Sequence, residues 1–233
     1  MSGFGLEFLL QRHPLGQGNS HIHKFGSNLA LAGASESIWS AGGLYPWASF
    51  ATAQTIYAIS TEAADTGDLE IQGLDENYVL QTKTLTLNGL TAVDTSGDST
   101  TFIRIFRMKY SGTNAGTITA RVTSGTGTVV AQIDAGVSQT LMAVYTVPAQ
   151  TTAFMLNYTV GTGKGDDAHL KLFARELGSS FQIKNEMKSY QSTITRDFPI
   201  PLRFEEKTDI DFRATTSSAN SDCIVNFDLV LVK

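Results

Sequence analysis

The chain of 233 residues is 42% hydrophobic and 17% charged, and its formal net charge is −5. This length is enough for one large or two small domains with a core of their own. The acidic balance argues against sequence-independent nucleic-acid binding, which needs clustered cations, and the single cysteine, Cys223, excludes an intramolecular disulfide framework.

Residues 1–28 are expected to form an extended N-terminal arm. Glycine and proline interrupt any helical period there, at Gly3, Gly5, Pro14, Gly16 and Gly18. The arm carries apolar side chains that are costly to leave in water, so we expect it to pack on its own body or on a neighbouring protein. The residues of the arm that we assign to this contact are Phe4, Leu6, Phe8, Leu9, Leu10, His21, His23 and Phe25.

No targeting or membrane segment is expected. The N-terminal residues have no positive region before their brief apolar run, as a secretory signal would have. Two long uncharged stretches, 37–61 and 135–163, contain proline and several Gly, Gln or Thr residues, so neither is a credible membrane span. Synthesis in a cytoplasm, without export by the usual route, is the expectation.

A cluster of large aromatic residues follows the arm. Trp39, Tyr45 and Trp47 lie among Gly42, Gly43 and Pro46, in a loop-like context. Aromatic residues in such a place usually plug the end of a sandwich or anchor an interface, and we include these three in the predicted interface. The alternative is an aromatic platform for sugars.

From about residue 54 onward the hydrophobic period is two, which is typical of half-buried strands. Leu69 and Ile71 face one way, and the residues between and after them face the other. A turn over 73–77 leads into a second strand over 78–87, in which the alternation slips and predicts a bulge or a change of face. Asn88-Gly89 is a strong hairpin signal because both residues tolerate positive φ.

The same pattern continues to the C-terminus. Residues 102–110 and 118–122 are expected to form a second hairpin, and 168–175 and 223–231 alternate most cleanly. Further strands are expected over 129–133, 141–147, 153–160 and 210–212. The side chains predicted to face inward in the two clean strands are Ala168, Leu170, Leu172, Ala174, Cys223, Val225, Phe227, Leu229 and Leu231.

Short strands with frequent turns, and no amphipathic helix of useful length, predict an all-β protein built as an antiparallel sandwich or barrel. A total of about fifteen strands is too many for one small sandwich. We therefore predict two antiparallel β-sandwich lobes of jelly-roll-like type, over 29–135 and 136–233, behind the arm of residues 1–28. One large jelly-roll-like sandwich is the alternative.

Motifs for chemistry are weak throughout the sequence. There is no G-x-S-x-G nucleophile motif, and Cys223 falls on the inward face of a strand. The glycine-rich stretch 161–165 lacks the spacing of a phosphate-binding loop. His21 and His23 would lie on one side of an extended segment, but a zinc site needs further ligands. We predict no catalytic residue, no metal site and no cofactor, and hence no enzyme.

Five stretches of the sequence, taken together, resemble a set of tailed-bacteriophage virion proteins common in aquatic phages. They cover most of the chain in order and are 23–28 (HKFGSN), 36–43 (ESIWSAGG), 71–78 (IQGLDENY), 84–89 (TLTLNG) and 227–232 (FDLVLV). The resemblance implies a virion component, assembled in the host cytoplasm. It supplies no catalytic residues.

Among virion roles, a capsid decoration or cement protein suits an apolar arm and a charge-poor sandwich best. Such a protein binds across capsomer joints, so its partners would be the major capsid protein or another virion protein. A homo-oligomer is expected, with a trimer favoured and a dimer possible. The alternatives are a tail or head fibre protein that binds a host receptor, and a carbohydrate-binding or carbohydrate-active jelly-roll module. Binding to nucleic acid or membrane is not expected.

Overall fold

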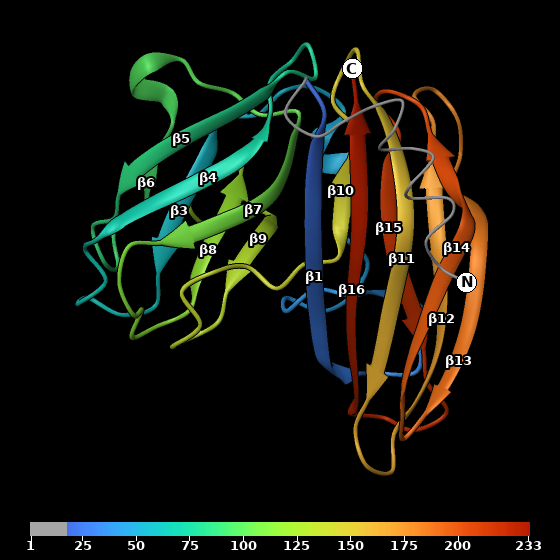
Figure 1. The fold of residues 1–233 in the computed structure, drawn as a ribbon. Coiled ribbons are helices and arrows are strands. Elements are labelled where there is room, and N and C mark those ends of the chain that lie inside the picture. Colours follow the sequence, from blue (N-terminus) through green and yellow to red (C-terminus); the bar gives the residue numbers. More distant parts are fainter. Residues whose placement is uncertain (1–17) are drawn as a thin grey trace. The chain divides into compact units, whose positions relative to one another are not determined.

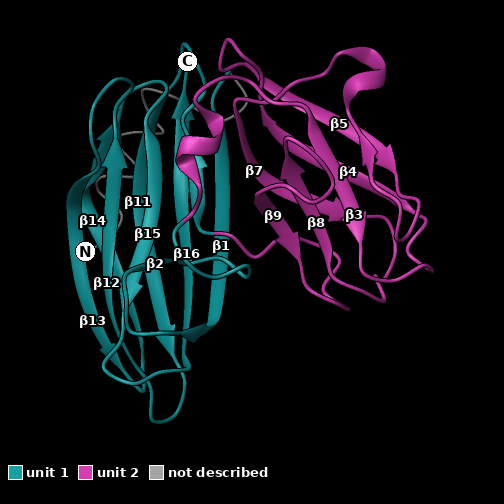
Figure 2. Cartoon of the chain, turned by 180° about the vertical axis from the view of Figure 1, so that it is seen from behind, with its two compact units in different colours: residues 1–44, 143–233 teal, residues 45–142 magenta. Residues whose placement is uncertain are grey.

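A computed structural model describes residues 18–233 of the chain. The chain divides into two compact units, of which unit 1 comprises residues 1–44 and 143–233 and unit 2 comprises residues 45–142 (Figure 2). Both are built from antiparallel sheets, so the predicted all-β class is confirmed. No helix in the described part of the chain is long and apolar enough to cross a membrane.

Unit 1 is a sandwich of two antiparallel sheets (Figure 1). The first sheet has the strand order β1 (Ser20–Leu31), β16 (Ser221–Val232), β11 (Thr152–Thr162), β14 (Thr193–Phe204). The second has the order β10 (Val144–Thr146), β15 (Asp209–Thr215), β12 (Asp167–Arg175), β13 (Gln182–Tyr190), and β2 (Glu36–Ser37) pairs with β15. The two edge strands β13 and β14 follow each other in the chain, so that one turn joins the two sheets.

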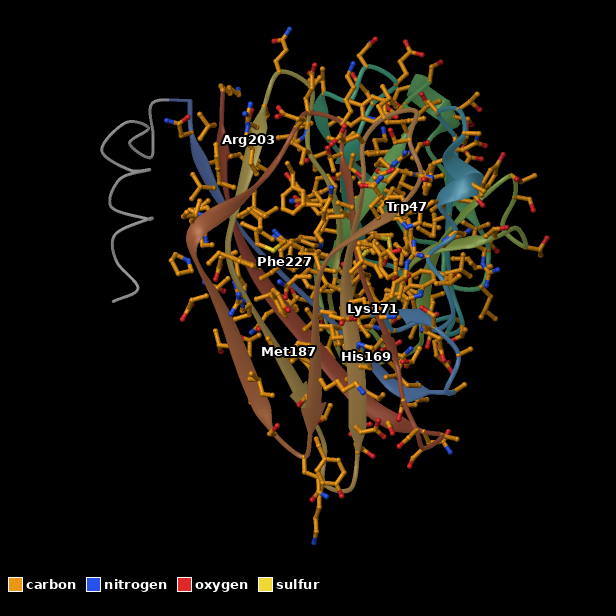
Figure 3. All side chains as sticks on the ribbon, turned by 90° about the vertical axis from the view of Figure 1, so that its right-hand side faces the viewer. Trp47, His169, Lys171, Met187, Arg203 and Phe227 are labelled. Carbon is orange, nitrogen blue, oxygen red and sulfur yellow. The ribbon has the colours of Figure 1, made fainter. Side chains whose placement is uncertain are left out.

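The core of unit 1 lies between these sheets. The Phe227 ring of β16 lies 5.0 Å from the Phe212 ring of β15, which in turn lies 5.2 Å from the Tyr158 ring of β11. All nine side chains predicted to face inward in the two clean strands are buried: Ala168, Leu170, Leu172, Ala174, Cys223, Val225, Phe227, Leu229 and Leu231. Figure 3 shows Phe227 within the packed interior of the unit. The period of two is visible in the sequence because the inward-facing residues of both strands are apolar throughout.

Unit 2 also contains two sheets. One has the order β6 (Val93–Asp94), β3 (Ile56–Ser60), β8 (Ile118–Val122), β9 (Val129–Ile133), and the other has the order β5 (Leu80–Thr86), β4 (Asp68–Leu74), β7 (Arg104–Tyr110). Two short 3-10 helices, η1 (Trp47–Phe50) and η2 (Ser96–Asp98), lie in the connections. Leu69 and Ile71 are fully buried, as the alternation of that strand predicted.

The predicted arm and lobe boundaries differ from the structure. Residues 20–28, placed in the arm, pair along their whole length with β16, so they form an integral strand of unit 1. Residues 29–44, placed in the first lobe, belong to the same unit as the C-terminal strands, because β1 and β2 pair with β16 and β15. Unit 2 is therefore an insertion between two parts of unit 1. The pairing of β1 and β2 with strands near the C-terminus could not be predicted, because pairing between distant segments leaves no pattern in the local sequence.

Two local predictions in unit 2 were wrong. The expected hairpin of 102–110 with 118–122 does not form: β7 pairs with β4, whereas β8 pairs with β3 and β9, so the chain crosses between sheets. The expected bulge or change of face in 78–87 is also missing. The β4–β5 pairing runs without interruption from Asp68 to Leu74, and the even-numbered residues of β5 are exposed throughout. The register shift in β4 lies on its other side, against β7.

Strands β13 and β14 were not predicted at all. Most of their side chains are exposed, so neither strand shows a hydrophobic period. Strand β14 also contains a bulge. Asp197 pairs with Asn157 and Leu202 pairs with Met155, so residues 198–201 of β14 lie opposite a single residue of β11. Pro199 and Pro201 flank Ile200 in this bulge, and the Ile200 side chain is 85% exposed. Prolines in sheets are confined to such edges and bulges.

Candidate interaction surface

The outer face of the first sheet of unit 1 carries three of the six described residues that were predicted to meet a partner. On β1, Ile22 pairs with Leu229 and Lys24 pairs with Phe227, which both face the core. His21, His23 and Phe25 therefore face away from the core, since successive side chains of a strand alternate. The register sets three rows of side chains across this face: His21, Val230, Phe154, Arg203; His23, Asp228, Asn157, Asp197; and Phe25, Asn226, Thr159, Thr195.

Two imidazoles share one carboxylate oxygen on this face. The Nε2 of His21 lies 2.9 Å and the Nδ1 of His23 lies 2.8 Å from Oδ1 of Asp228, and each nitrogen donates to that oxygen. Burial raises the pKa of Asp228, but hydrogen bonds and charge from the two histidines lower it by more, so the net shift is downward. The carboxylate thus fixes both rings on the surface of the sheet.

The two imidazoles and the carboxylate form a polar cluster on the surface of the sheet. Within residues 18–233, no group of three or more His, Cys, Asp or Glu side chains is placed to hold a metal ion. The His23 ring also lies 5.9 Å from the Phe25 ring, at an interplanar angle of 40°. Together these contacts give the β1 side of the face an ordered set of polar and aromatic groups.

Next to the histidines lies an apolar cluster, formed by Val230 and Val232 of β16 with Phe154 and Leu156 of β11. Val230 is 1% exposed although it faces away from the core, and Phe154 and Leu156 are half-buried. Leu156 sits where the register of β11 shifts against both neighbours, as at a β-bulge. Ser20 at the start of β1 pairs with Leu231, so the chain enters the sheet beside this cluster.

Of the two placements expected for the aromatic residues of the 39–47 region, the structure has packing within the fold, so their inclusion in the predicted interface is wrong. Trp39, Tyr45 and Trp47 are all buried. The Trp39 indole donates to the Gly43 carbonyl at 3.1 Å, and the Tyr45 hydroxyl donates to the Ile105 carbonyl at 3.2 Å. The Tyr45 and Trp47 rings meet edge to face at 4.7 Å. These rings are packed into the fold, so they form neither an exposed anchor nor an open platform for sugars.

The remaining predicted interface residues, Phe4, Leu6, Phe8, Leu9 and Leu10, lie outside the described residues. Conversely, sequence analysis missed Phe154, Asp228 and Val230. Two of these residues could have been predicted from the alternation of the strand. Since Phe227 and Leu229 face inward, Asp228 and Val230 between and after them face outward. The pairing of β1 with β16, which brings the histidines to Asp228, had no such signal.

Comparison with known proteins adds little to this description. No protein-family model matches the chain, and no curated protein matches it. Among solved structures, the chain is similar to the crystal structure of the PBSX exported protein XepA, at 11% sequence identity and a TM-score of 0.21. The match covers 90% of this chain and 84% of that chain. At this level of similarity, function has to be argued from the surface itself.

Proposed function

We propose that the protein is a structural component of a tailed-bacteriophage virion, and that it acts as a capsid decoration (cement) protein. In this role it binds the major capsid protein or another virion protein across the joints between capsomers. The resemblance of its sequence to virion proteins supports the virion assignment. The outer face of the first sheet of unit 1 supports the mode of attachment.

One observation carries the proposal: apolar and polar groups adjoin on that face. Phe154, Leu156, Val230 and Val232 form an apolar centre, and the histidines with Asp228 border it. Stable protein interfaces have this anatomy, with an apolar core and a polar rim. Strand β1 begins beside this apolar centre, since Ser20 pairs with Leu231.

The framework behind the face suits a protein that has to resist mechanical force. Strands β1, β11, β14 and β16 have 11 to 12 residues each, and their neighbours hydrogen-bond along most of that length. Close-packed cores have low compressibility, so such a sandwich transmits force instead of yielding. A homo-oligomer, a trimer by preference, would present several copies of the face to the shell.

The test combines copy number with a surface mutation. Reconstruction of purified particles should locate the chain at capsomer joints, in copy numbers comparable with the major capsid protein. Phe154→Glu should abolish attachment to particles, because it places a charge in the apolar centre. The matched control, Ile183→Glu, introduces the same charge at an exposed site on β13 of the other sheet and should attach normally.

Thermal melts of both variants separate loss of attachment from loss of folding. Since Phe154 packs against Val230, a second variant, His23→Ala, tests the rim of the same face without disturbing the apolar centre. A copy number of only tens per particle would contradict the role of cement protein and favour that of a tail or head fibre protein. Attachment of both Phe154→Glu and His23→Ala at wild-type levels would reject this face as the contact.

A further inference from the structure

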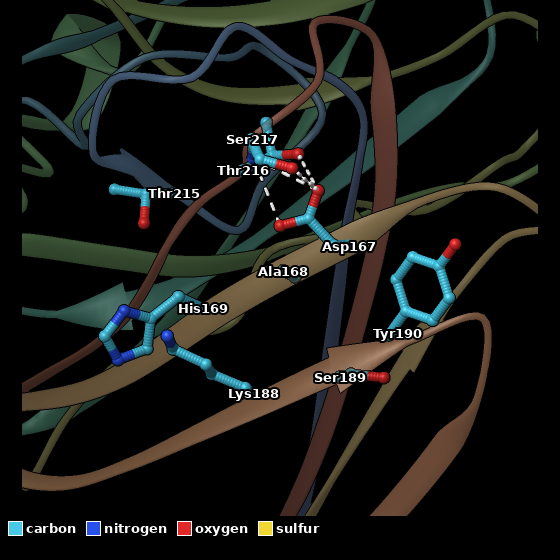
Figure 4. A pocket seen from close by; sticks show the side chains of 9 residues that line it. All are labelled: Asp167, Ala168, His169, Lys188, Ser189, Tyr190, Thr215, Thr216 and Ser217. Atoms are coloured by element: carbon cyan, nitrogen blue, oxygen red, sulfur yellow. Dashed lines mark hydrogen bonds between the residues drawn. The ribbon is translucent and has the colours of Figure 1, made fainter.

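A groove of about 390 Å³ lies on unit 1, where β12, β13 and the end of β15 meet (Figure 4). Strand pairing assembles it: Asp167 lies opposite Tyr190, and His169 lies between Lys188 on one side and Thr215 on the other. Ser217, in the turn after β15, completes the polar lining. The volume falls within the range of small-molecule sites, roughly 300 to 1,000 Å³.

The carboxylate of Asp167 is held in place at the groove by the turn after β15. The Ser217 backbone N–H donates to both carboxylate oxygens at 3.1 Å, and the Ser217 hydroxyl donates to Oδ1 at 2.6 Å. The Thr216 hydroxyl adds a further hydrogen bond at 3.1 Å. The hydrogen bond from the Ser217 hydroxyl is the main cause of the lowered pKa of Asp167, which keeps the carboxylate ionised. The groove therefore contains a fixed hydrogen-bond acceptor.

Tyr190 supplies an apolar surface beside these polar groups. It is 66% exposed, which leaves much of a large aromatic ring in water. Such rings combine an apolar body with a polar tip and are enriched where proteins bind ligands. The ring stands at the rim of the groove, on the strand next to Asp167 (Figure 4).

The charged groups at the groove are of both signs. Lys188 lies beside His169, and the Nε2 of His169 lies 3.1 Å from a carboxylate oxygen of Glu186. The groove is thus lined by Lys188 and His169 together with the carboxylate of Asp167, whereas Glu186 lies outside the lining. A strongly anionic ligand such as a phosphate, or a cationic one, would meet a like charge. The groove lining contains hydroxyl groups together with hydrogen-bond donors and acceptors. It therefore suits a ligand that both donates and accepts hydrogen bonds.

We propose that this groove binds a neutral saccharide. The ring of Tyr190 stacks on the apolar face of a sugar, Lys188 and Thr215 hydrogen-bond sugar hydroxyls, and Asp167 accepts from one of them. The inference is independent of the virion role, because a cement protein needs no glycan and a glycan-binding protein needs no capsid.

The test uses the full chain, free of particles, on an array of neutral hexose and N-acetylhexosamine oligosaccharides, with calorimetric titration of the saccharides that bind. Tyr190→Ala should weaken binding about tenfold or more, as loss of a central aromatic contact does. Tyr190→Phe, which keeps the ring, should stay within about twofold of wild type. Lys188→Met should weaken binding as well.

Ile200→Ala is the matched control, since it removes another exposed hydrophobic side chain of unit 1 away from the groove lining, and it should bind normally. The inference is overturned if the wild-type chain binds no neutral saccharide, or if Tyr190→Ala binds as well as wild type. Binding restricted to phosphorylated or sialylated glycans would overturn the assignment to neutral ligands. None of these outcomes bears on the copy number or location of the chain in particles.

Discussion

At the scale of single residues, backbone contacts in unit 2 leave no room for a side chain at Gly73. A Cβ at Gly73 would lie 2.1 Å from the Arg104 carbonyl oxygen and 2.7 Å from the Phe102 ring. This close approach occurs at the register shift between Gln72 and Gly73 in the pairing of β4 with β7. Glycine is required at such a close approach because any Cβ forces the two strands apart.

Gly73→Ala is therefore expected to lower the free energy of unfolding of unit 2 by about 1 to 3 kcal/mol, the usual cost of overpacking. Urea denaturation measures the change. Gly97→Ala is the control in the same unit, because a Cβ at that position would meet no atom within 4 Å and the φ of Gly97 is not left-handed. A Gly73→Ala variant as stable as Gly97→Ala would contradict the close approach.

At the scale of elements, β16 shows how one strand serves two surfaces. Its odd-numbered residues from Cys223 to Leu231 are buried in the core, whereas Asp228 and Val230 belong to the outer face. Phe227→Ala should lower the free energy of unfolding of unit 1 by about 3 to 5 kcal/mol, because it leaves a cavity between the sheets. Chemical denaturation of the variant provides the measurement.

Ile224→Ala tests the opposite face of the same strand. Ile224 is 51% exposed, so its truncation should change the unfolding free energy by no more than about 0.5 kcal/mol. Equal losses of unfolding free energy in Phe227→Ala and Ile224→Ala would contradict the structure, which places Phe227 on the buried face of the strand and Ile224 on the exposed face.

Elements also explain what the sequence could and could not reveal. Strands β12 and β16 were predictable because one face of each is buried and the period of two is plain. Strands β13 and β14 lie at sheet edges with most side chains in water, so no pattern marks them. His21 and His23 were expected on one side of an extended segment, but their partner Asp228 lies 205 residues from His23 in the chain. Burial of Trp39, Tyr45 and Trp47 likewise depends on contacts that loop composition does not encode.

At the scale of the whole molecule, unit 2 is inserted into unit 1 between Leu44 and Ala143. On either side of the insertion, the chain of unit 1 hydrogen-bonds to one of two adjacent residues of the same unit. The Ser37 N–H donates to the Gly43 carbonyl at 3.0 Å, and the Ala143 N–H donates to the Ile38 carbonyl at 2.8 Å. A chain that leaves and returns at nearly the same point can lose or gain an insertion without stretching the host.

Excision of residues 45–142, with a flexible Gly/Ser linker of about four residues in their place, should give a unit 1 that folds by itself. Residues 45–142 expressed alone should fold as well. Each fragment is expected to show a strand-rich circular dichroism spectrum and one cooperative thermal transition. Fragments that melt without cooperativity would show that neither part is self-sufficient.

The bulged edge of β14 has a consequence for how copies of the protein can associate. An open sheet edge is a template on which another chain can add a strand, and repeated addition produces filaments. Pro199 and Pro201 carry no N–H for such a partner, and the bulge between them turns the backbone out of line. Addition of another strand along residues 199–201 is thereby disfavoured, so the prolines and the bulge protect this part of the sheet edge from pairing with a second copy.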